Sequence, residues 1–498
     1  MKKKCVIIGS GLGGLSCGYI LLKNGYDVTI LEQDNQIGGC LQCFSRDGVK
    51  FETGMHFIGS LDKGQTLSYL THYLDIDKDI NLNRLNTKAY DVVSLNGDRF
   101  CFANGKENFI ETMASYFPKE KDNLRIYFDL IEKIAKASSL HSLNYDEYDN
   151  IINTKYQTQT INEVIDNIIQ DSLLRDVLVG NLPLYAGVKD KTPFSTHAFI
   201  MDFYNQSAFR VVGGSDSIAL SLAKSINNQG GIIVTNKKVK HIVCDESKAI
   251  GVETEDEMFY QADIVIADIH PTCVMKMLDT KMIRPAFRQR INNIPNTIGG
   301  FSVYLKFKKD KVPYMNSNFY GFKNNSPWNC DMYDENTWPK GYLYMHFCHK
   351  NNPTFAESGV VLSYMKMQEM EPWINTFVNN RGEDYLEFKN SKAKKLLSEV
   401  EKDFPVLKDN IESFYTSTPL TYRDYTNTKD GSMYGVVKDV SLGSSCRVHH
   451  RTKVPNLLLT GQNINSHGML GVLVGTIVTC SALLGEENIY NQIKQANK

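Results

Sequence analysis

The sequence lacks a surplus of charge of either sign. Its 55 lysines and arginines are balanced by 56 aspartates and glutamates, which leaves a net charge of −1. Proteins that attract nucleic acid or acidic membranes over their whole surface carry a basic surplus, and no such overall field exists here. We therefore expect no nucleic-acid partner.

Long hydrophobic runs are also missing. The most apolar stretch, Gly468 to Gly485, is shorter than the roughly 20 residues that span a bilayer, and glycine, threonine and serine interrupt it. We expect a buried helix against a ligand there.

The lysines at positions 2–4 precede an apolar stretch, as in a signal peptide. That stretch is itself a glycine-rich loop, and its cleavage would destroy the first structural unit.

Cysteine is neither dense nor regularly spaced, since the 11 cysteines are scattered and odd in number. This is typical of a reducing compartment, so we expect a cytoplasmic protein, which leaves room for peripheral contact with a membrane. Repeats and low-complexity segments are absent as well. With 498 residues, of which 42% are hydrophobic, the chain predicts a globular protein of two or more subdomains.

The N-terminal residues have the layout of a dinucleotide-binding βαβ unit. A buried run at 5–8 leads into Gly9, Gly11 and Gly14, followed by a helical stretch and a second buried run at 28–31. These glycines allow a tight turn, a close approach to a pyrophosphate and close packing of the helix. Glu32 ends the second run, where it can bond a ribose hydroxyl and repel a 2′-phosphate.

Later segments give this unit a family context. A Gly-Gly pair stands at 38–39, the run 51–59 reads F-E-T-G-M-H-F-I-G, and a strand at 455–460 leads through Gly461 into 468–473. This combination resembles the family of flavin-dependent phytoene desaturases, carotenoid isomerases and retinol saturases, within the amine-oxidase-like flavoproteins. The resemblance spans almost the whole chain.

The resemblance implies an α/β fold: a Rossmann-type (GR2-like) FAD-binding domain with a second, α+β substrate or cap domain built from two insertions. We expect the FAD-binding domain at 1–61, 206–280 and 445–498, and the cap at 62–205 and 281–444. The first insertion shows helical periodicity, and the second, rich in aromatic residues, predicts a mixed sheet and a helix near 392–404. Most of those aromatics would be core, although as a group they could line an apolar tunnel.

The resemblance also implies which residues hold FAD, with Val239 beside the adenine and the 461–471 segment at the ribityl and pyrimidine end. These are Gly9, Ser10, Gly11, Gly13, Gly14, Leu15, Glu32, Gln33, Gly38, Gly39, Gly54, Met55, His56, Val239, Gly461, Gln462, Met469, Leu470 and Gly471. One position departs from the family: Asn463 stands where relatives usually have aspartate, so a charged hydrogen bond to the ribityl chain becomes neutral.

Candidates for chemistry are fewer. His56, in a segment that the family places beside the flavin, could donate a proton or orient the flavin, or simply be a packed histidine. Tyr422, Tyr434 and Arg423 are weaker candidates for that role.

Two other patterns have rival interpretations. Cys40 and Cys43 have the spacing of a redox dithiol but do not open the helix of a thioredoxin-like unit. His346 and His349, three apart on an expected strand, would point to opposite faces, so we expect no metal site.

The function implied is an FAD-dependent oxidoreductase that acts on carbon–carbon double bonds of an apolar polyene or isoprenoid lipid, through hydride transfer at flavin N5. The segments 54–59 and 460–462 favour saturation or isomerisation over desaturation. A flavin-free escort protein for lipid or prenyl groups and an amine oxidase are the alternatives. No second G-x-G-x-x-G unit is present, so NAD(P)H or another reductant would act without a dedicated domain.

Overall fold

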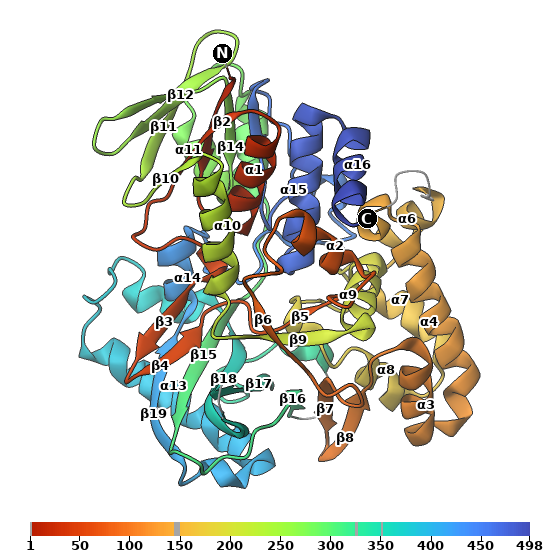
Figure 1. Ribbon diagram of the computed structural model, residues 1–498. Coiled ribbons are helices and arrows are strands. Elements are labelled where there is room, and N and C mark those ends of the chain that lie inside the picture. Colours follow the sequence, from red (N-terminus) through yellow and green to blue (C-terminus); the bar gives the residue numbers. More distant parts are fainter. Residues whose placement is uncertain (1, 144–149, 324–326, 350–351) are drawn as a thin grey trace.

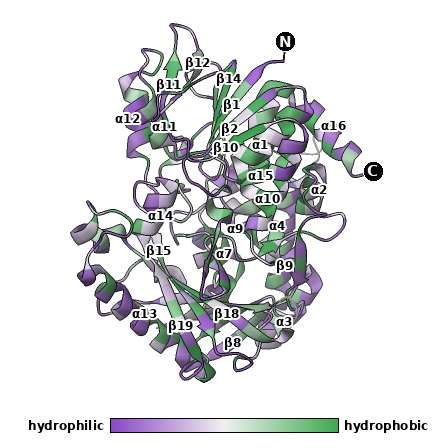
Figure 2. Cartoon of the chain, turned by 60° about the vertical axis from the view of Figure 1, so that its left-hand side comes forward, coloured by the Kyte–Doolittle hydropathy of each residue, from purple (hydrophilic) through white to green (hydrophobic). Residues whose placement is uncertain are grey.

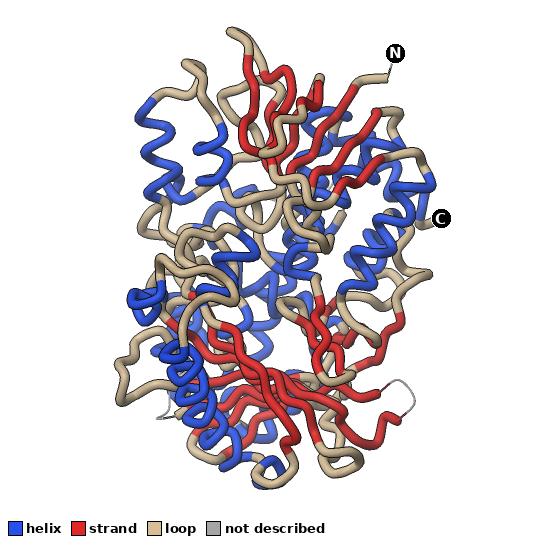
Figure 3. The backbone as a smooth tube through the Cα atoms, turned by 90° about the vertical axis from the view of Figure 1, so that its left-hand side faces the viewer, coloured by secondary structure: helices blue, strands red, loops and turns tan. Residues whose placement is uncertain are grey.

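The computed structural model describes residues 2–143, 150–323, 327–349 and 352–498 (Figure 1). A parallel sheet lies at one end of the molecule and a larger mixed sheet at the other, with helices along one side (Figures 1 and 3).

The parallel sheet is built around the first strand of the chain. Its order is β10-β2-β1-β14-β20, and every neighbouring pair runs parallel. The strands are β1 (Lys4–Ile8), β2 (Asp27–Leu31), β10 (Ile232–Val234), β14 (Ile264–Ala267) and β20 (Leu457–Leu459). Figure 2 shows hydrophobic residues gathered here, as expected for parallel strands covered on both faces.

Helices pack closely on this sheet. They are α1 (Leu12–Lys23), α10 (Asp216–Asn228), α15 (Gly468–Leu484) and α16 (Glu486–Ala496). Helix α1 is buried from Leu12 to Leu21 because it lies against the sheet, α10 and α15 together. The expected buried helix at the C-terminal end is thus α15, and no helix of the described residues is long and apolar enough to cross a membrane.

A small antiparallel sheet and two helices extend the same end. The strands are β11 (Val239–Cys244), β12 (Ala249–Thr254) and β13 (Phe259–Gln261), and the helices are α11 (Pro271–Met277) and α12 (Pro285–Asn293). They share one hydrophobic core with the outer face of the parallel sheet.

The larger sheet has the order β19-β15-β18-β17-β16-β7-β8 and is antiparallel except where β16 meets β7. Its strands are β7 (Asp91–Leu95), β8 (Asp98–Phe102), β15 (Gly299–Phe307), β16 (Asn318–Phe322), β17 (Gly341–His349), β18 (Asn352–Met365) and β19 (Ile411–Ser417). The neighbouring helices are α13 (Glu383–Asp403) and α14 (Pro419–Thr426). Helix α13 begins nine residues before the expected Lys392 and buries Leu396, Leu397 and Val400.

The first insertion is not purely helical, which corrects the sequence expectation. Its helices are α2 (Thr66–Tyr73), α3 (Lys106–Tyr116), α4 (Lys121–Lys136), α5 (Ser139–Ser142), α6 (Asn150–Gln157), α7 (Ile161–Ile168), α8 (Ser172–Leu178) and α9 (Phe194–Gln206). Strands β7 and β8 of the same stretch form a hairpin that joins the large sheet. Asn96 and Gly97, both with positive φ, make its two-residue turn, which is the strongest short signal for a hairpin.

Two small sheets connect the ends of the molecule. One is the hairpin of β3 (Cys43–Arg46) and β4 (Val49–Glu52); the other has the order β5-β9-β6, with β5 (Ile58–Gly59), β6 (Asn81–Arg84) and β9 (Ala208–Val212). Short 3₁₀ turns complete the chain: η1 (Gly39–Leu41), η2 (Pro118–Glu120), η3 (Leu182–Leu184), η4 (Pro327–Asn329), η5 (Met367–Trp373), η6 (Pro405–Leu407) and η7 (Gly443–Cys446). The domain boundaries given above stay a prediction.

We predict that Leu473→Ala destabilises the protein by about 2–5 kcal/mol, because Leu473 of α15 is fully buried against the α1 side of the parallel sheet and its loss leaves a cavity. Urea unfolding followed by circular dichroism measures the change. Leu220→Ala is the matched control, since Leu220 of α10 is exposed, and its effect stays within about 0.5 kcal/mol. Equal losses in both variants would contradict the burial of α15.

Candidate active site

A cavity of about 460 Å³ opens at the carboxyl ends of the parallel strands, where open α/β sheets bind ligands. It runs from Glu32 and Val239 at one end to Leu343 and Leu362 of the large sheet at the other. Most of the predicted site residues line it: Gly9, Ser10, Gly11, Gly13, Glu32, Gln33, Gly38, Gly39, Gly54, Met55, His56, Val239, Tyr422, Tyr434, Gly461, Gln462 and Met469.

Four predicted cofactor residues do not line the cavity. A Cβ on Gly14 would lie 2.2 Å from the Gly9 carbonyl oxygen, so Gly14 serves the close packing of helix and strand. Leu15 and Leu470 are buried in the core beneath the site, and Gly471 packs against Ser466. We therefore assign these positions to the support of the site rather than to its wall.

The glycine turn leaves room and free donors for an anion. Gly9 adopts φ +94°, and a Cβ on Gly13 would lie 2.9 Å from the Gly461 nitrogen. Helix α1 begins after Gly11, which has no side chain to cap it, and the Gly14 amide is bound by Asp268. The positive end of the helix dipole and the other amides of the first turn face the cavity. This is the arrangement that receives a pyrophosphate.

Glu32 lies directly beyond β2 and is buried at the edge of the cavity. Its Oε2 accepts hydrogen bonds from the Ser10 nitrogen at 2.9 Å and the Ser10 hydroxyl at 2.5 Å, and its Oε1 accepts one from the Asp34 nitrogen at 3.0 Å. The carboxylate is thereby held at the place where a ribose hydroxyl would reach it.

Asp268 is the main site residue that sequence reasoning missed. It follows β14 and accepts a 2.7 Å hydrogen bond from the Gly14 nitrogen with Oδ2. A Cβ on Gly11 would lie 2.5 Å from Oδ2, so the carboxyl is wedged against the glycine turn. Burial raises the pKa of Asp268 to about 7, the Gly14 amide lowers it, and the charge of Glu32 raises it again. The sequence signal that could have identified Asp268 is the one used for Glu32, an acidic residue that directly follows a buried strand.

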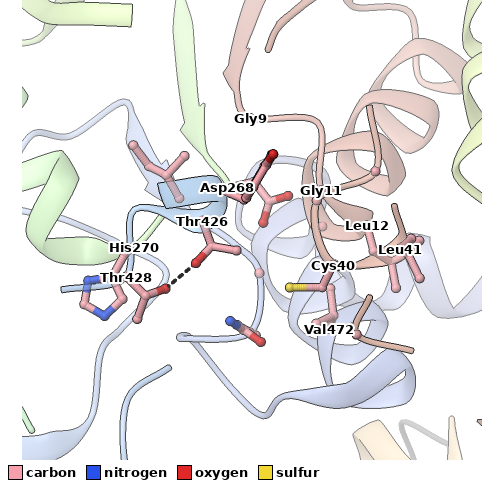
Figure 4. A pocket seen from close by; sticks show the side chains of 18 of the residues that line it. Gly9, Gly11, Leu12, Cys40, Leu41, Asp268, His270, Thr426, Thr428 and Val472 are labelled. Atoms are coloured by element: carbon pink, nitrogen blue, oxygen red, sulfur yellow. Dashed lines mark hydrogen bonds between the residues drawn. The ribbon is translucent and has the colours of Figure 1, made fainter. Parts of the chain in front are cut away.

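Figure 4 shows how the walls meet. Asp268 and Cys40 approach the same space from opposite sides, next to the glycine turn. Thr426 and Thr428, joined by a 2.8 Å hydrogen bond, and His270 form another wall. None of these residues was predicted as a cofactor contact.

The far end of the cavity is apolar and tyrosine-rich. Tyr204, which the sequence did not single out, lies there with Leu184, Leu343 and Met433. Burial raises the pKa of Tyr204 and of the two predicted tyrosines, so the phenols stay protonated.

The weaker catalytic candidates already have partners. The Tyr422 hydroxyl donates to the Thr53 carbonyl at 3.4 Å, and the Tyr434 hydroxyl donates to the Pro183 carbonyl at 3.2 Å. Arg423 does not line the cavity, because its guanidinium bonds the carbonyls of Ile374 and Thr376. His56 lines the cavity and is almost fully buried.

The cysteine pair is split by the fold. Cys40 lines the cavity, whereas the thiol of Cys43 lies 3.5 Å from the Ser215 hydroxyl, away from it. Burial raises the pKa of each thiol to about 11, which leaves little thiolate at neutral pH. The structure therefore gives no support to a redox dithiol.

The histidine pair gives no metal site within the described residues, which contain no cluster of metal-ligating side chains. His346 is buried, with Nδ1 accepting a 3.0 Å hydrogen bond from the Met315 nitrogen and Nε2 bonded to the Tyr344 hydroxyl. The side chain of His349 lies outside what the structure describes.

Asn463 performs a structural task beside the ribityl segment. Its Oδ1 accepts a 3.0 Å hydrogen bond from the Val436 nitrogen, and a Cβ on Gly435 would lie 2.0 Å from the same oxygen. The asparagine also lines the cavity. The neutral side chain of Asn463 thus joins the C-terminal segment to the loop at residues 435–436.

Comparison with known proteins decides the family. Residues 12–473 match the family model described as flavin containing amine oxidoreductase. The chain belongs to this family. It is 26% identical to the human all-trans-retinol 13,14-reductase, over 99% of this chain and 87% of that protein. It is 24% identical to the 1-hydroxycarotenoid 3,4-desaturase of Flavobacterium sp., with 94% and 96% covered.

A solved structure shows the same fold. The Methanosarcina mazei oxidoreductase has a TM-score of 0.65 at 15% identity, with 96% of this chain and 100% of that chain covered. The expected Rossmann-type FAD domain with a second domain is confirmed, and so is the resemblance stated from the motifs. The protein is a flavin-dependent oxidoreductase by family.

The residues present fit the FAD that this family implies. The backbone at Gly11, Gly13 and Gly461 leaves a space that side chains would fill. A Cβ at these positions would lie 2.5, 2.7 and 2.2 Å from Asp268. Glu32 and Val239 would hold the adenosine end, the first turn of α1 the pyrophosphate, and residues 461–469 the flavin end.

We predict that FAD binding weakens by about tenfold between pH 6 and pH 8, because Asp268 ionises across this range and its charge then opposes the pyrophosphate. Asp268→Asn keeps an oxygen for the Gly14 amide but cannot ionise, so its affinity should stay nearly constant. Fluorescence titration of apoprotein with FAD measures both. A wild-type affinity that does not change with pH would contradict the effect.

Proposed function

We propose that the protein reduces or isomerises carbon–carbon double bonds of an apolar polyene or isoprenoid lipid with FAD as cofactor. The observation that carries this proposal is the lining of the cavity. Its charged side chains all gather at the dinucleotide end: Glu32, Asp34, Lys237, Lys238, Lys240, Asp268 and Lys276. The remaining described lining carries none.

An apolar lining suits a substrate without charge. Leu184, Leu343, Leu362 and Met433 offer it dispersion contacts, and a charged amine or carboxylate would be buried there without a partner. Lining of this kind disfavours an amine or amino-acid substrate. The activities for which two relatives are named, retinol reduction and carotenoid desaturation, agree with an extended polyene.

The chain's own residues position the substrate and exclude water. The Tyr434 ring lies 4.6 Å from the His467 ring, and its hydroxyl is tied to Pro183, so this wall is fixed. A bound flavin would supply or accept a hydride at N5. His56 lines the cavity between Met55 and Phe57, and an imidazole can both donate and accept a proton, which suits the proton that must accompany hydride transfer.

The flavin-free escort hypothesis is disfavoured by the intact glycine cradle and Glu32. An escort protein has no need for free helix-start amides beside a buried carboxylate that can bind a ribose. Purified protein that shows no flavin absorption, and releases no FAD on denaturation, would overturn the oxidoreductase proposal in favour of this alternative.

We predict a mass gain of two hydrogens, or an unchanged mass with altered retention, when the protein is incubated anaerobically with reduced FAD and a lipid extract. Mass spectrometry separates the two outcomes, which correspond to saturation and isomerisation. Gly13→Val is the matched control: its side chain would collide with Gly461 and Asp268, so it should bind no FAD and form no product. Peroxide release from an amine, without lipid product, would instead support the amine oxidase.

Apolar side chains are also exposed on the segment 374–378, outside the cavity lining. Phe377 is 75% exposed, and Ile374 and Val378 are exposed beside it. Arg423 of α14 bonds the Ile374 carbonyl at 2.5 Å, so this segment is tied to the helix whose Tyr425 lines the cavity and is itself exposed. We propose that this segment rests on a lipid surface from which the substrate enters.

We predict that Phe377→Ser lowers co-sedimentation with neutral phosphatidylcholine vesicles by several-fold without changing FAD content, because it removes the most exposed aromatic of the segment. Leu220→Ser, at an exposed position on α10, is the control and should bind vesicles like the wild type. Identical sedimentation of the wild type and Phe377→Ser would contradict the proposed contact.

A further inference from the structure

A buried carboxylate stands behind His56. Glu52 is the last residue of β4, and the three residues Thr53, Gly54 and Met55 carry the chain from it to His56. Both side chains are less than a tenth exposed, but only His56 lines the cavity. Glu52 is therefore separated from substrate and cofactor by the imidazole ring.

The two side chains face each other. His56 Nδ1 lies 3.5 Å from Glu52 Oε2, and neither atom has another hydrogen-bond partner among the described residues. A carboxylate in this position accepts a hydrogen bond from Nδ1–H, which fixes the ring tautomer and leaves Nε2 as the nitrogen available to the cavity. A small rotation would shorten the contact to an ordinary hydrogen bond.

The turn between them is held rigidly. A Cβ on Gly54 would lie 2.9 Å from the Cys40 carbonyl oxygen, so the turn packs against the residues after the Gly38–Gly39 pair. The His56 carbonyl accepts a 3.3 Å hydrogen bond from Arg210 Nη1 of β9. Arg210 is anchored in turn by the Asn318 amide oxygen at 2.9 Å. The backbone of His56 thus has little freedom to turn the ring.

We propose that Glu52 is a positioning residue that holds the Nδ1 proton of His56 and so makes Nε2 the atom that delivers a proton to the substrate. This inference rests on the proposed function. In saturation, the Nε2–H bond of the imidazolium breaks, its electron pair stays on nitrogen, and the proton forms a C–H bond with the π electrons of the double bond. The other carbon takes a hydride from reduced flavin, which a two-electron donor such as dithionite restores.

The surroundings of Glu52 suit a carboxylate that works through one neighbour. Burial raises the pKa of Glu52, and the hydrogen bond and charge of His56, followed by the charge of Arg210 on β9, lower it. The Ser215 amide also lowers it, and the Cys43 thiol faces Glu52 across the hairpin. His56 and the guanidinium of Arg210 are therefore the side chains that oppose the effect of burial on this carboxyl group.

The first test reads the tautomer directly and needs no substrate. In protein labelled with ¹⁵N-histidine, the signals of His56 are those that disappear in His56→Gln. We expect Nδ1–H in the neutral ring of the wild type and a shift towards Nε2–H in Glu52→Leu, which offers no acceptor. An unchanged tautomer in Glu52→Leu overturns the proposal, even if the lipid activity is confirmed.

The second test separates charge from structure. Glu52→Gln keeps the size and an acceptor but loses the charge that stabilises the imidazolium, so the high-pH limb of the kcat profile should move down by about one pH unit. KM and FAD content should not change, and activity should recover at low pH. Glu246→Gln, at an exposed position, is the matched control and should keep the wild-type profile. A uniform loss at every pH would show a merely structural role and overturn the proposal.

Discussion

The site depends on the close approach of three backbone segments around one carboxyl group. The first glycine turn, the end of β14 and the turn at Gly461 come very close together. A Cβ added to any glycine of these two turns would contact Asp268. Only glycine allows this approach, and only parallel strands deliver three distant segments to one edge of a sheet. The Gly14 amide, held by Asp268, fixes the start of α1 and with it the orientation of the helix dipole.

This constraint also sets where charge can be placed. The carboxylates of Glu32 and Asp268 raise the electrostatic cost of an anion at the dinucleotide end, and the free amides of α1 offset that cost. Away from this end, the described residues of the wall include no acidic or basic side chain other than the imidazole of His56. The cavity is thus divided into a polar part that can hold a dinucleotide and an apolar part that can hold a chain of carbon atoms.

Local patterns could be predicted from the sequence, and contacts between distant segments could not. The βαβ unit, the buried helix α15 and most of the cavity lining follow from glycine spacing and from the family resemblance. The hairpin of β7 and β8 was missed although Asn96-Gly97 signals it, because strong helical patterns surround it. Asp268 was missed because its partner Gly14 is 254 residues away. The contact of Arg210 with His56 was missed for the same reason, since 154 residues separate the two in the sequence.

Two acids, Asp268 in the cavity wall and Glu52 behind it, show how one type of side chain serves two purposes. Asp268 accepts a hydrogen bond from a backbone amide, a partner that cannot gain or lose a proton, so it braces the loop and passes no proton to that partner. Glu52 faces an imidazole, whose charge can change, so the energy of the pair depends on where a proton lies. Arg210 contributes a fixed positive charge close by, while its hydrogen bonds to His56 and Asn318 tie the turn to the large sheet. Glu52 and His56 therefore place a transferable proton in the cavity wall, where the proposed reaction of a double bond would need it.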